Sequence, residues 1–132
     1  MTVPVILVDT SVWIELVNRW PPICVEEERL YNLATCGPVV QEVLQGLREH
    51  SSAAAFRAAF LALPVLGDPL SIQTFQAAAE IYRLGRSKGY TVRSSADCLI
   101  AAIAIEHQVP VWHQDRDFDL LSRFTTLQIH HG

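Results

Sequence analysis

The sequence predicts an α/β fold built around a mostly parallel sheet. Short runs of apolar and β-branched residues, such as Val3–Val8 and Val109–His113, are typical of strands that are buried on both faces. Longer segments with helical features separate these runs, and strands that alternate with helices usually form parallel sheets. No linker, repeat or change of composition divides the sequence, so we expect residues 1–132 to form a single domain.

In the first half of the chain, a helix at Thr10–Asn18 should follow the first strand and end at Trp20-Pro21-Pro22. A second helix is predicted at Cys24–Thr35, because acidic residues occupy its first turns, where the helix dipole favours them. Gly37-Pro38 should end that helix. The other elements expected here are a short strand at Pro38–Val40, a helix at Gln41–Glu49, a helix from Ser51 or Ser52 to Leu63, and a short strand at Pro64–Leu66.

In the second half, Ser71 is the expected cap of a long helix that runs to about Lys88, and Gly89 suits its C-terminal end. Ser94 or Ser95 should cap a helix at Ala96–His107. The remaining elements are a strand at Val109–His113, a short helix at Asp117–Arg123 and a last strand at Thr126–Ile129. The His130-His131 pair has no third ligand at suitable spacing, so we expect a solvated tail there.

The composition favours a folded protein in the cytoplasm. Half of the residues are hydrophobic and 18% are charged, which excludes a disordered chain. Val3–Val8 has no basic region before it and is followed by Asp9, so it is not a signal peptide, and no apolar run is long enough to span a bilayer. The odd number of cysteines, without short spacings, indicates small buried side chains and not a zinc or redox site.

The formal charge of −4 argues against a protein that grips nucleic acid by charge alone. A cluster of catalytic carboxylates would itself contribute negative charge, which bound cations would offset. Lys88 is the only lysine among the ten basic residues, and arginine is well suited to phosphate oxygens.

Four acidic residues from distant segments are predicted to meet at one edge of the sheet. Asp9 directly follows the first strand, and Asp115 follows the Val109–His113 strand after one residue. Glu42 lies at the start of a predicted helix, and Asp97 lies in the first turn of another. Because ligands of parallel sheets bind beyond the carboxyl ends of the strands, this edge is the expected site.

Carboxylates brought together repel one another and resist ionisation unless a cation compensates. Ligand sets made only of oxygen select hard ions such as Mg²⁺ or Mn²⁺, and such ions promote displacement at phosphorus. Asp117 is a further candidate ligand or a helix cap, whereas Asp119 is expected on the solvent face of its helix.

Each acid also has an ordinary structural explanation. Asp9 can cap the following helix, Asp97 can offset a helix dipole, and Glu42 can lie on a solvated helix face. Asp97 is the strongest candidate, because the residues around it are apolar and a carboxylate there needs a reason to be buried.

Four segments together resemble the motifs of the PIN-domain family, especially its VapC toxins. They are Val8–Ile14, Glu42 at the head of a helix, Val92–Ala102 and His113–Phe118, and their order fits across essentially the whole chain. The resemblance implies a three-layer α/β/α sandwich with a mostly parallel central sheet, and RNA cleavage that requires Mg²⁺ or Mn²⁺. It maps the catalytic and metal-binding acids onto Asp9, Glu42, Asp97 and Asp115, and it marks Ser11 as a supporting hydroxyl.

The resemblance also implies a biological role. A VapC-like endoribonuclease toxin hydrolyses RNA, leaves a 5′-phosphate and a 3′-hydroxyl, and inhibits translation until a VapB-type antitoxin neutralises it. A homodimer and a toxin–antitoxin hetero-oligomer are implied, with DNA contacted only through the antitoxin and no membrane partner. Arg93 and Arg116 lie beside the motifs and are either phosphate contacts or surface arginines paired with nearby acids. RNA with unpaired bases is the expected substrate.

Two other functions fit parts of the pattern. A phosphatase or phosphotransferase would use Asp9 as a nucleophile, but such enzymes usually carry a second acid two residues later, where this chain has Ser11. A non-catalytic PIN-like module would bind a partner, and its acids would be structural or would bind metal without turnover. The complete set of four acids favours catalysis.

Overall fold

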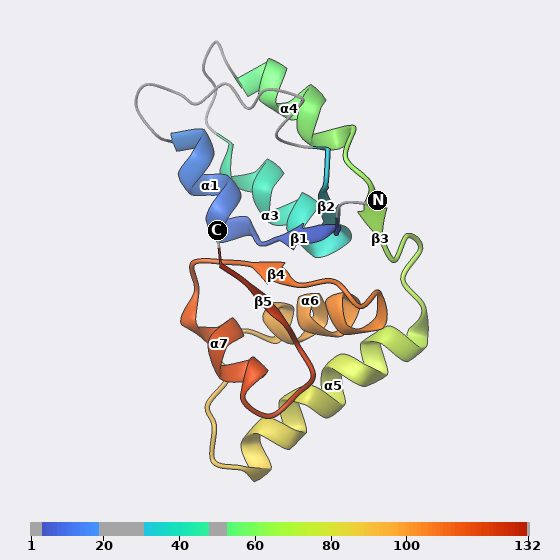
Figure 1. The fold of residues 1–132 in the computed structure, drawn as a ribbon, viewed down its shortest axis with the longest axis vertical. Coiled ribbons are helices and arrows are strands. Elements are labelled where there is room, and N and C mark those ends of the chain that lie inside the picture. The colour runs from blue at the N-terminus through green and yellow to red at the C-terminus, as the bar shows by residue number, and fades with distance from the viewer. Residues whose placement is uncertain (1–3, 19–30, 48–52, 132) are drawn as a thin grey trace.

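A computed structural model of the chain describes residues 4–18, 31–47 and 53–131 (Figure 1). The expectations for Trp20-Pro21-Pro22, for Cys24 and for the start of the second helix lie outside the described residues. Five parallel strands form one sheet in the order β3-β2-β1-β4-β5. They are β1 (Ile6–Val8), β2 (Leu33–Cys36), β3 (Val65–Leu66), β4 (Val111–Trp112) and β5 (Ile129–His130). The sequence-based prediction of an α/β fold with a parallel sheet is confirmed.

Helices cover both faces of the sheet. The described helices are α1 (Thr10–Asn18), α3 (Gly37–Gly46), α4 (Ala53–Leu61), α5 (Ile72–Ser87), α6 (Ser95–Glu106) and α7 (Arg116–Ser122). Figure 1 shows α1, α3 and α4 on one side of the sheet and α5, α6 and α7 on the other, which makes three layers. No helix in the described part of the chain is long and apolar enough to cross a membrane.

The region around Gly37-Pro38 differs from the prediction. Leu33–Thr35 was expected at the end of a helix but belongs to the buried strand β2. Pro38–Val40 was expected as a strand but lies in the first turns of α3. The periodicity of a short apolar run does not distinguish a buried strand from a helix. Pairing with neighbouring strands of the sheet determines which one forms. Pro38 stands near the N-terminus of α3, where its missing N–H removes no helical hydrogen bond, so it begins a helix there and does not stop one.

Several helix ends agree with the sequence. The Ser71 side chain accepts a hydrogen bond from the Thr74 N–H at 3.3 Å, and Gly89 adopts a φ of 81° just beyond the end of α5. Ser94 lies at the N-cap of α6, but its side chain makes no capping hydrogen bond. The last strand begins later than expected and includes His130, so this histidine belongs to the sheet and not to a solvated tail.

The strand order creates a switch point between β1 and β4. From β1 the chain continues to β2 and β3 on one side, whereas β4 leads to β5 on the other side. Val8 pairs with Trp112, and the Asp9 N–H donates to the Trp112 carbonyl at 2.9 Å, so the two strands end side by side. Ligands of parallel sheets bind outside the carboxyl ends of strands at such a switch point.

Helix α6 is the centre of the core. Its buried residues occupy nearly every position from Asp97 to Ala104, so this helix is enclosed on almost all sides. It packs along α5, where the Thr74 hydroxyl donates to a Glu106 carboxylate oxygen at 2.8 Å. A helix that is apolar all round has its orientation set by packing on every face, so the position of Asp97 is set by the core.

Trp13 connects the core to the end of β1. Its ring is fully buried and packs edge-on against Phe60, with 5.3 Å between ring centroids. Its indole N–H donates to the Val8 carbonyl at 3.2 Å, one residue before Asp9. Trp13 is therefore a core residue that also holds the strand end on which Asp9 lies.

We expect Trp13→Phe to lower the free energy of unfolding by about 1–3 kcal/mol, because the substitution removes a buried hydrogen-bond donor and part of a packed ring. Urea denaturation followed by circular dichroism would measure the change. An exposed substitution on α5, Gln76→Ala, is a suitable control. Equal stability of Trp13→Phe and the wild type would show that this contact does not hold the strand end.

Candidate metal centre

Three carboxylates converge at the carboxyl edge of the sheet. Asp97, Asp115 and Asp117 each offer one oxygen, and these oxygens lie within 4.8 Å of one another. Asp97 comes from the first turn of α6, Asp115 from the loop after β4, and Asp117 from the first turn of α7. Asp97 and Asp117 are each 7% exposed. The structure thus brings Asp97 and Asp115 together, as predicted. It also adds Asp117, for which the sequence allowed either a metal ligand or a helix cap.

Asp97 has the most perturbed carboxyl group of the cluster. Burial raises its pKa from 3.8 to about 7, and the negative charges of Asp9, Asp115, Asp117 and Glu42 contribute to the same shift. Its Oδ2 atom is buried and has no hydrogen-bond partner. A buried polar atom without a partner is unfavourable, so a positive ligand at this position would satisfy both the charge and the missing bond.

Asp9 is held by the hydroxyl of Ser11. The Asp9 side chain is buried, and its Oδ2 accepts hydrogen bonds from the Ser11 N–H at 3.1 Å and the Ser11 hydroxyl at 2.6 Å. The same hydroxyl accepts the Gln114 N–H at 3.0 Å. Ser11 therefore connects the end of β1 to the loop that carries Asp115. Asp9 also lies at the N-cap position of α1. It can therefore cap this helix and also contribute negative charge to the acidic cluster.

Asp115 caps α7 and is held from both sides. Its Oδ1 accepts the Asp117 N–H at 3.0 Å, and its own N–H donates to His113 Nδ1 at 3.1 Å. Because Nδ1 accepts, Nε2 carries the hydrogen of the neutral ring and donates to Asp119 Oδ1 at 3.1 Å. His113 was not singled out in the sequence. The only signal there is its place directly after β4, where side chains turn towards the site.

Glu42 lies at the margin of the cluster. It is exposed on α3, yet partial desolvation raises its pKa, and the charge of Asp9 adds to the shift. Asp9 and Glu42 are not part of the group of three oxygens, but both are close enough for their charges to raise the pKa of Asp97. All of the predicted acids therefore share one electrostatic site, with Asp97, Asp115 and Asp117 at its centre.

The neighbouring arginines and cysteines differ in exposure. Arg93 and Arg116 are exposed, and neither forms an ion pair with a carboxylate in the described part of the chain. Cys36 and Cys98 are buried, as the sequence predicted, and burial raises the pKa of their thiols to about 12 and about 11. Thiols with such values remain protonated at neutral pH and do not act as metal ligands or nucleophiles.

The chemistry of the donor set fits a hard divalent cation. The three converging groups are all carboxylates, and one of their buried oxygens lacks a partner. Oxygen-only sites of this kind bind Mg²⁺ or Mn²⁺ in preference to zinc or copper, which favour nitrogen and sulfur.

Comparison with known proteins now identifies the family. The family model of the PIN domain matches residues 6–123, a range that includes every acid of the site. This chain belongs to the PIN-domain family. It is 41% identical over 129 residues to Ribonuclease VapC11 of Mycobacterium tuberculosis and to VapC ribonuclease Mb1587 of Mycobacterium bovis, which covers 93% of this chain and 96% of each relative. This PIN domain therefore groups with the VapC proteins, as the four sequence motifs indicated.

Solved structures show the same PIN fold. VapBC-5 from Mycobacterium tuberculosis, a member of the VapBC family of toxin–antitoxin systems, has a TM-score of 0.64 and 26% identity. The match covers 96% of this chain and 98% of that one. FitAcB from Neisseria gonorrhoeae also has a TM-score of 0.64 over 96% of both chains, and its 18% identity supports the fold alone.

The raised pKa of Asp97 has a consequence for stability. In metal-free protein the unfolded chain loses this proton near pH 3.8 and the folded chain near pH 7, so the free energy of unfolding should fall as pH rises between these values. Asp97→Asn cannot ionise, so at pH 8 it should be more stable than the wild type by about 1–3 kcal/mol, and the difference should vanish near pH 4.

Urea denaturation across this pH range in the presence of EDTA would measure the difference. Added Mn²⁺ should stabilise the wild type more than the variant, because an ion that binds only the folded state favours that state. Identical pH profiles for the two proteins would contradict the buried, repelled state of Asp97.

Proposed function

We propose that this PIN domain is a metal-dependent endoribonuclease toxin that hydrolyses RNA phosphodiesters, inhibits translation and is neutralised by a VapB-type antitoxin. The observation that carries the proposal is the buried Asp97 carboxylate, with one unpaired oxygen beside two further carboxylates. Such a cluster of carboxylates lowers the stability of the metal-free protein. A cation that binds there and takes part in a reaction would explain why the protein contains this cluster. The relatives named as VapC ribonucleases support the reaction class.

The proposed cofactor is Mg²⁺ or Mn²⁺. Asp97, Asp115 and Asp117 would hold the ion directly, with Asp9 and Glu42 placed to add ligands, partly through water. A divalent ion bound there would lower the pKa of a water molecule and neutralise charge on the scissile phosphate.

The chain's own residues would prepare this site in distinct ways. Ser11 orients the Asp9 carboxylate and holds the Gln114 N–H, so the two strand ends keep a fixed separation. The cap that Asp115 forms on α7 fixes Asp115 and Asp117 relative to each other. Arg93 and Arg116, exposed and without an ion pair among the described residues, would contact phosphates of the RNA backbone.

The proposed partners follow from the family. The VapBC-5 likeness supports a VapB-type antitoxin in a toxin–antitoxin hetero-oligomer, which would contact DNA only through the antitoxin. A homodimer is also proposed, and exposed apolar side chains on α5 support a protein contact there: Ile72 is 66% exposed, Phe75 45% and Leu84 42%. Exposed apolar groups of this size often lie in interfaces. Because the proposed substrate is RNA, the proposed location of the activity is the cytoplasm.

A non-catalytic PIN-like module is the alternative function. The exposed apolar residues on α5 would serve such a module equally well, so they do not distinguish it from a toxin. The unpaired Asp97 oxygen argues against a module whose acids are only structural, because partner binding alone gives no reason to bury a carboxylate among like charges. A module that binds metal without turnover differs from the toxin only in RNA cleavage.

We expect purified, antitoxin-free protein to cleave total cellular RNA with Mg²⁺ or Mn²⁺ and to lose this activity in EDTA. Asp97→Asn should lower the rate by about a hundredfold or more, because it removes a charged ligand from the centre of the site. Gel electrophoresis of the RNA would report cleavage. Glu80→Gln, which neutralises an exposed carboxylate on α5, is the matched control and should cut as the wild type does.

Two results would contradict the enzyme. If well-folded wild-type protein cuts no RNA with either ion, the partner-binding module becomes the better explanation. If Asp97→Asn cuts as fast as the wild type, cleavage occurs somewhere other than the acidic cluster.

A further prediction separates ligands from supporting groups. Asp117→Asn should weaken Mn²⁺ binding strongly, whereas Ser11→Ala should weaken it about tenfold, because Ser11 orients Asp9 and does not contact the ion. Isothermal titration calorimetry would give both affinities, and circular dichroism would check the fold. Unchanged Mn²⁺ affinity in Asp117→Asn would assign Asp117 to a structural role on α7.

A further inference from the structure

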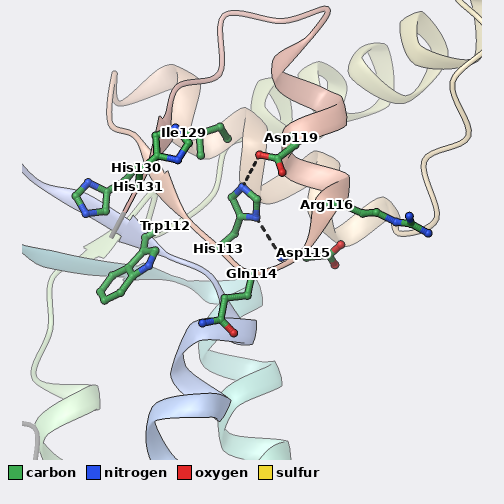
Figure 2. Close-up of a pocket in the computed structure, with 9 residues that line it drawn as sticks. All are labelled: Trp112, His113, Gln114, Asp115, Arg116, Asp119, Ile129, His130 and His131. Atoms are coloured by element: carbon green, nitrogen blue, oxygen red, sulfur yellow. Dashed lines mark hydrogen bonds and ion pairs between the residues drawn. The ribbon is translucent and has the colours of Figure 1, made fainter.

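A cleft of about 480 Å³ lies beside the acidic cluster, beyond the carboxyl ends of β4 and β5 (Figure 2). Its lining includes Trp112, Gln114, Asp115, Arg116, Asp119 and His130. Figure 2 shows Trp112, His130 and His131 on one side of the cleft, and Asp115 and Arg116 on the other. His113 and Asp119 lie between these two groups. The volume lies within the range typical of small-ligand sites.

The cleft and the candidate metal centre share Asp115. This residue lines the cleft and also contributes an oxygen to the group formed with Asp97 and Asp117. A ligand in the cleft is therefore next to the carboxylates that would act on a phosphodiester. For a polymer such as RNA, a nucleotide bound there would be close in the chain to the cleaved phosphate.

One wall of the cleft is aromatic. Trp112 on β4 and His130 on β5 occupy paired positions in the sheet, and their ring centroids are 5.7 Å apart at an interplanar angle of 68°. Both residues are half-buried, so each retains ring surface towards the cleft. Aromatic surfaces of this kind accept unpaired bases by stacking.

The other groups of the cleft provide hydrogen bonds. The Gln114 side chain is exposed and makes no hydrogen bond with the described residues. Asp119 is 57% exposed and accepts one hydrogen bond, from His113, at Oδ1, so its Oδ2 is available as an acceptor. His113, with its side chain only 6% exposed and its ring against Phe118, fixes Asp119 in this position.

Two simpler ligands fit the cleft less well. A metal ion would need converging ligands, and among the described residues the histidines of the cleft form no such group. A free phosphate would meet two carboxylates, Asp115 and Asp119, with Arg116 as the only arginine of the lining. An aromatic wall with an amide and a carboxylate acceptor suits a base that carries an amino group.

We propose that this cleft binds one unpaired nucleotide of the RNA substrate, next to the cleaved phosphate, with its base against Trp112 and His130. Gln114 and Asp119 bind the edge of the base, and Arg116 contacts its phosphate. Adenine, cytosine and guanine carry an exocyclic amino group that can donate a hydrogen bond to Asp119, whereas the N3–H of uracil lies between two carbonyl oxygens that repel a carboxylate. The cleft therefore disfavours uridine. This inference rests on the proposed ribonuclease function for its substrate.

Binding of short single-stranded homopolymers tests the proposal without cleavage. In an Asp97→Asn background, fluorescence anisotropy would compare labelled oligoadenylate, oligocytidylate and oligouridylate. We expect oligouridylate to bind the most weakly. Trp112→Ala should weaken binding of all three about tenfold or more, through lost stacking. Asp119→Asn, which keeps an oxygen for His113 and replaces the other carboxylate oxygen with an amide donor, should reduce the discrimination against uridine several-fold. Gln114→Ala should weaken binding of all three oligonucleotides several-fold, because it removes one of the two groups that bind the base edge.

We expect Gln114→Ala to leave the fold intact, because the side chain is exposed and makes no hydrogen bond with the described residues. Gln76→Ala on α5 is its matched control and should bind as the parent does. If Trp112→Ala and Gln114→Ala, both folded, bind the three oligonucleotides as the parent does, the subsite is overturned. Equal binding of all three by the parent would overturn the selection against uridine.

Cleavage of a randomised single-stranded RNA pool, followed by sequencing of the new ends, separates this inference from the proposed function. Depletion of uridine at one position beside the cut, lost in Asp119→Asn, supports the subsite. Cleavage with the same preference in wild type, Asp119→Asn and Trp112→Ala would overturn the subsite and keep the ribonuclease. Selective binding without any cleavage would overturn the ribonuclease and keep the cleft as an RNA-binding site.

Discussion

The repulsion among carboxylates at the switch point between β1 and β4 is the constraint on which the site depends. Parallel strands that end side by side bring Asp9 next to the loop that carries Asp115, and α6 adds Asp97 from the adjoining layer. Burial, together with the negative charges of the neighbouring acids, raises the Asp97 pKa to about 7, and one of its oxygens has no hydrogen-bond partner. A bound cation, or a proton on Asp97, relieves this repulsion, so the acidic cluster could hold a metal ion.

Close packing and hydrogen bonds hold the acids in place despite this repulsion. Helix α6 is enclosed on nearly all sides, so Asp97 cannot turn away from its neighbours without disturbing the core. Beyond the strand ends, hydrogen bonds of Ser11 in α1 connect Asp9 to the loop after β4, and hydrogen bonds of His113 connect that loop to α7 through Asp115 and Asp119. Hydrogen-bonded supports of this kind orient metal ligands and tune their affinity, so these neighbours matter as much as the acids.

The same loop after β4 connects the metal centre to the cleft. Every residue from Trp112 to Arg116 lines the cleft, and Asp115 also belongs to the acidic cluster. A short segment thus links the groups proposed to act on the phosphate to the groups proposed to select the base. In this arrangement, proteins with the same set of acids could differ in substrate through the residues around them, because the acids would act on a phosphate group that all RNA shares.

The sequence by itself determined the fold class, the family and the edge of the sheet where the acids meet, because strand ends and four spaced motifs are local features of the chain. It misplaced β2, since a short apolar run between helices becomes a strand only when a neighbouring strand pairs with it. The membership of Asp117 in the central cluster depends on the turn of α7, and the role of His113 depends on Asp119 and Asp115. The wall made by Trp112 and His130 depends on the register of β4 with β5. Only the tertiary structure decided these features, because each one is a contact between side chains whose positions are set by packing and strand pairing.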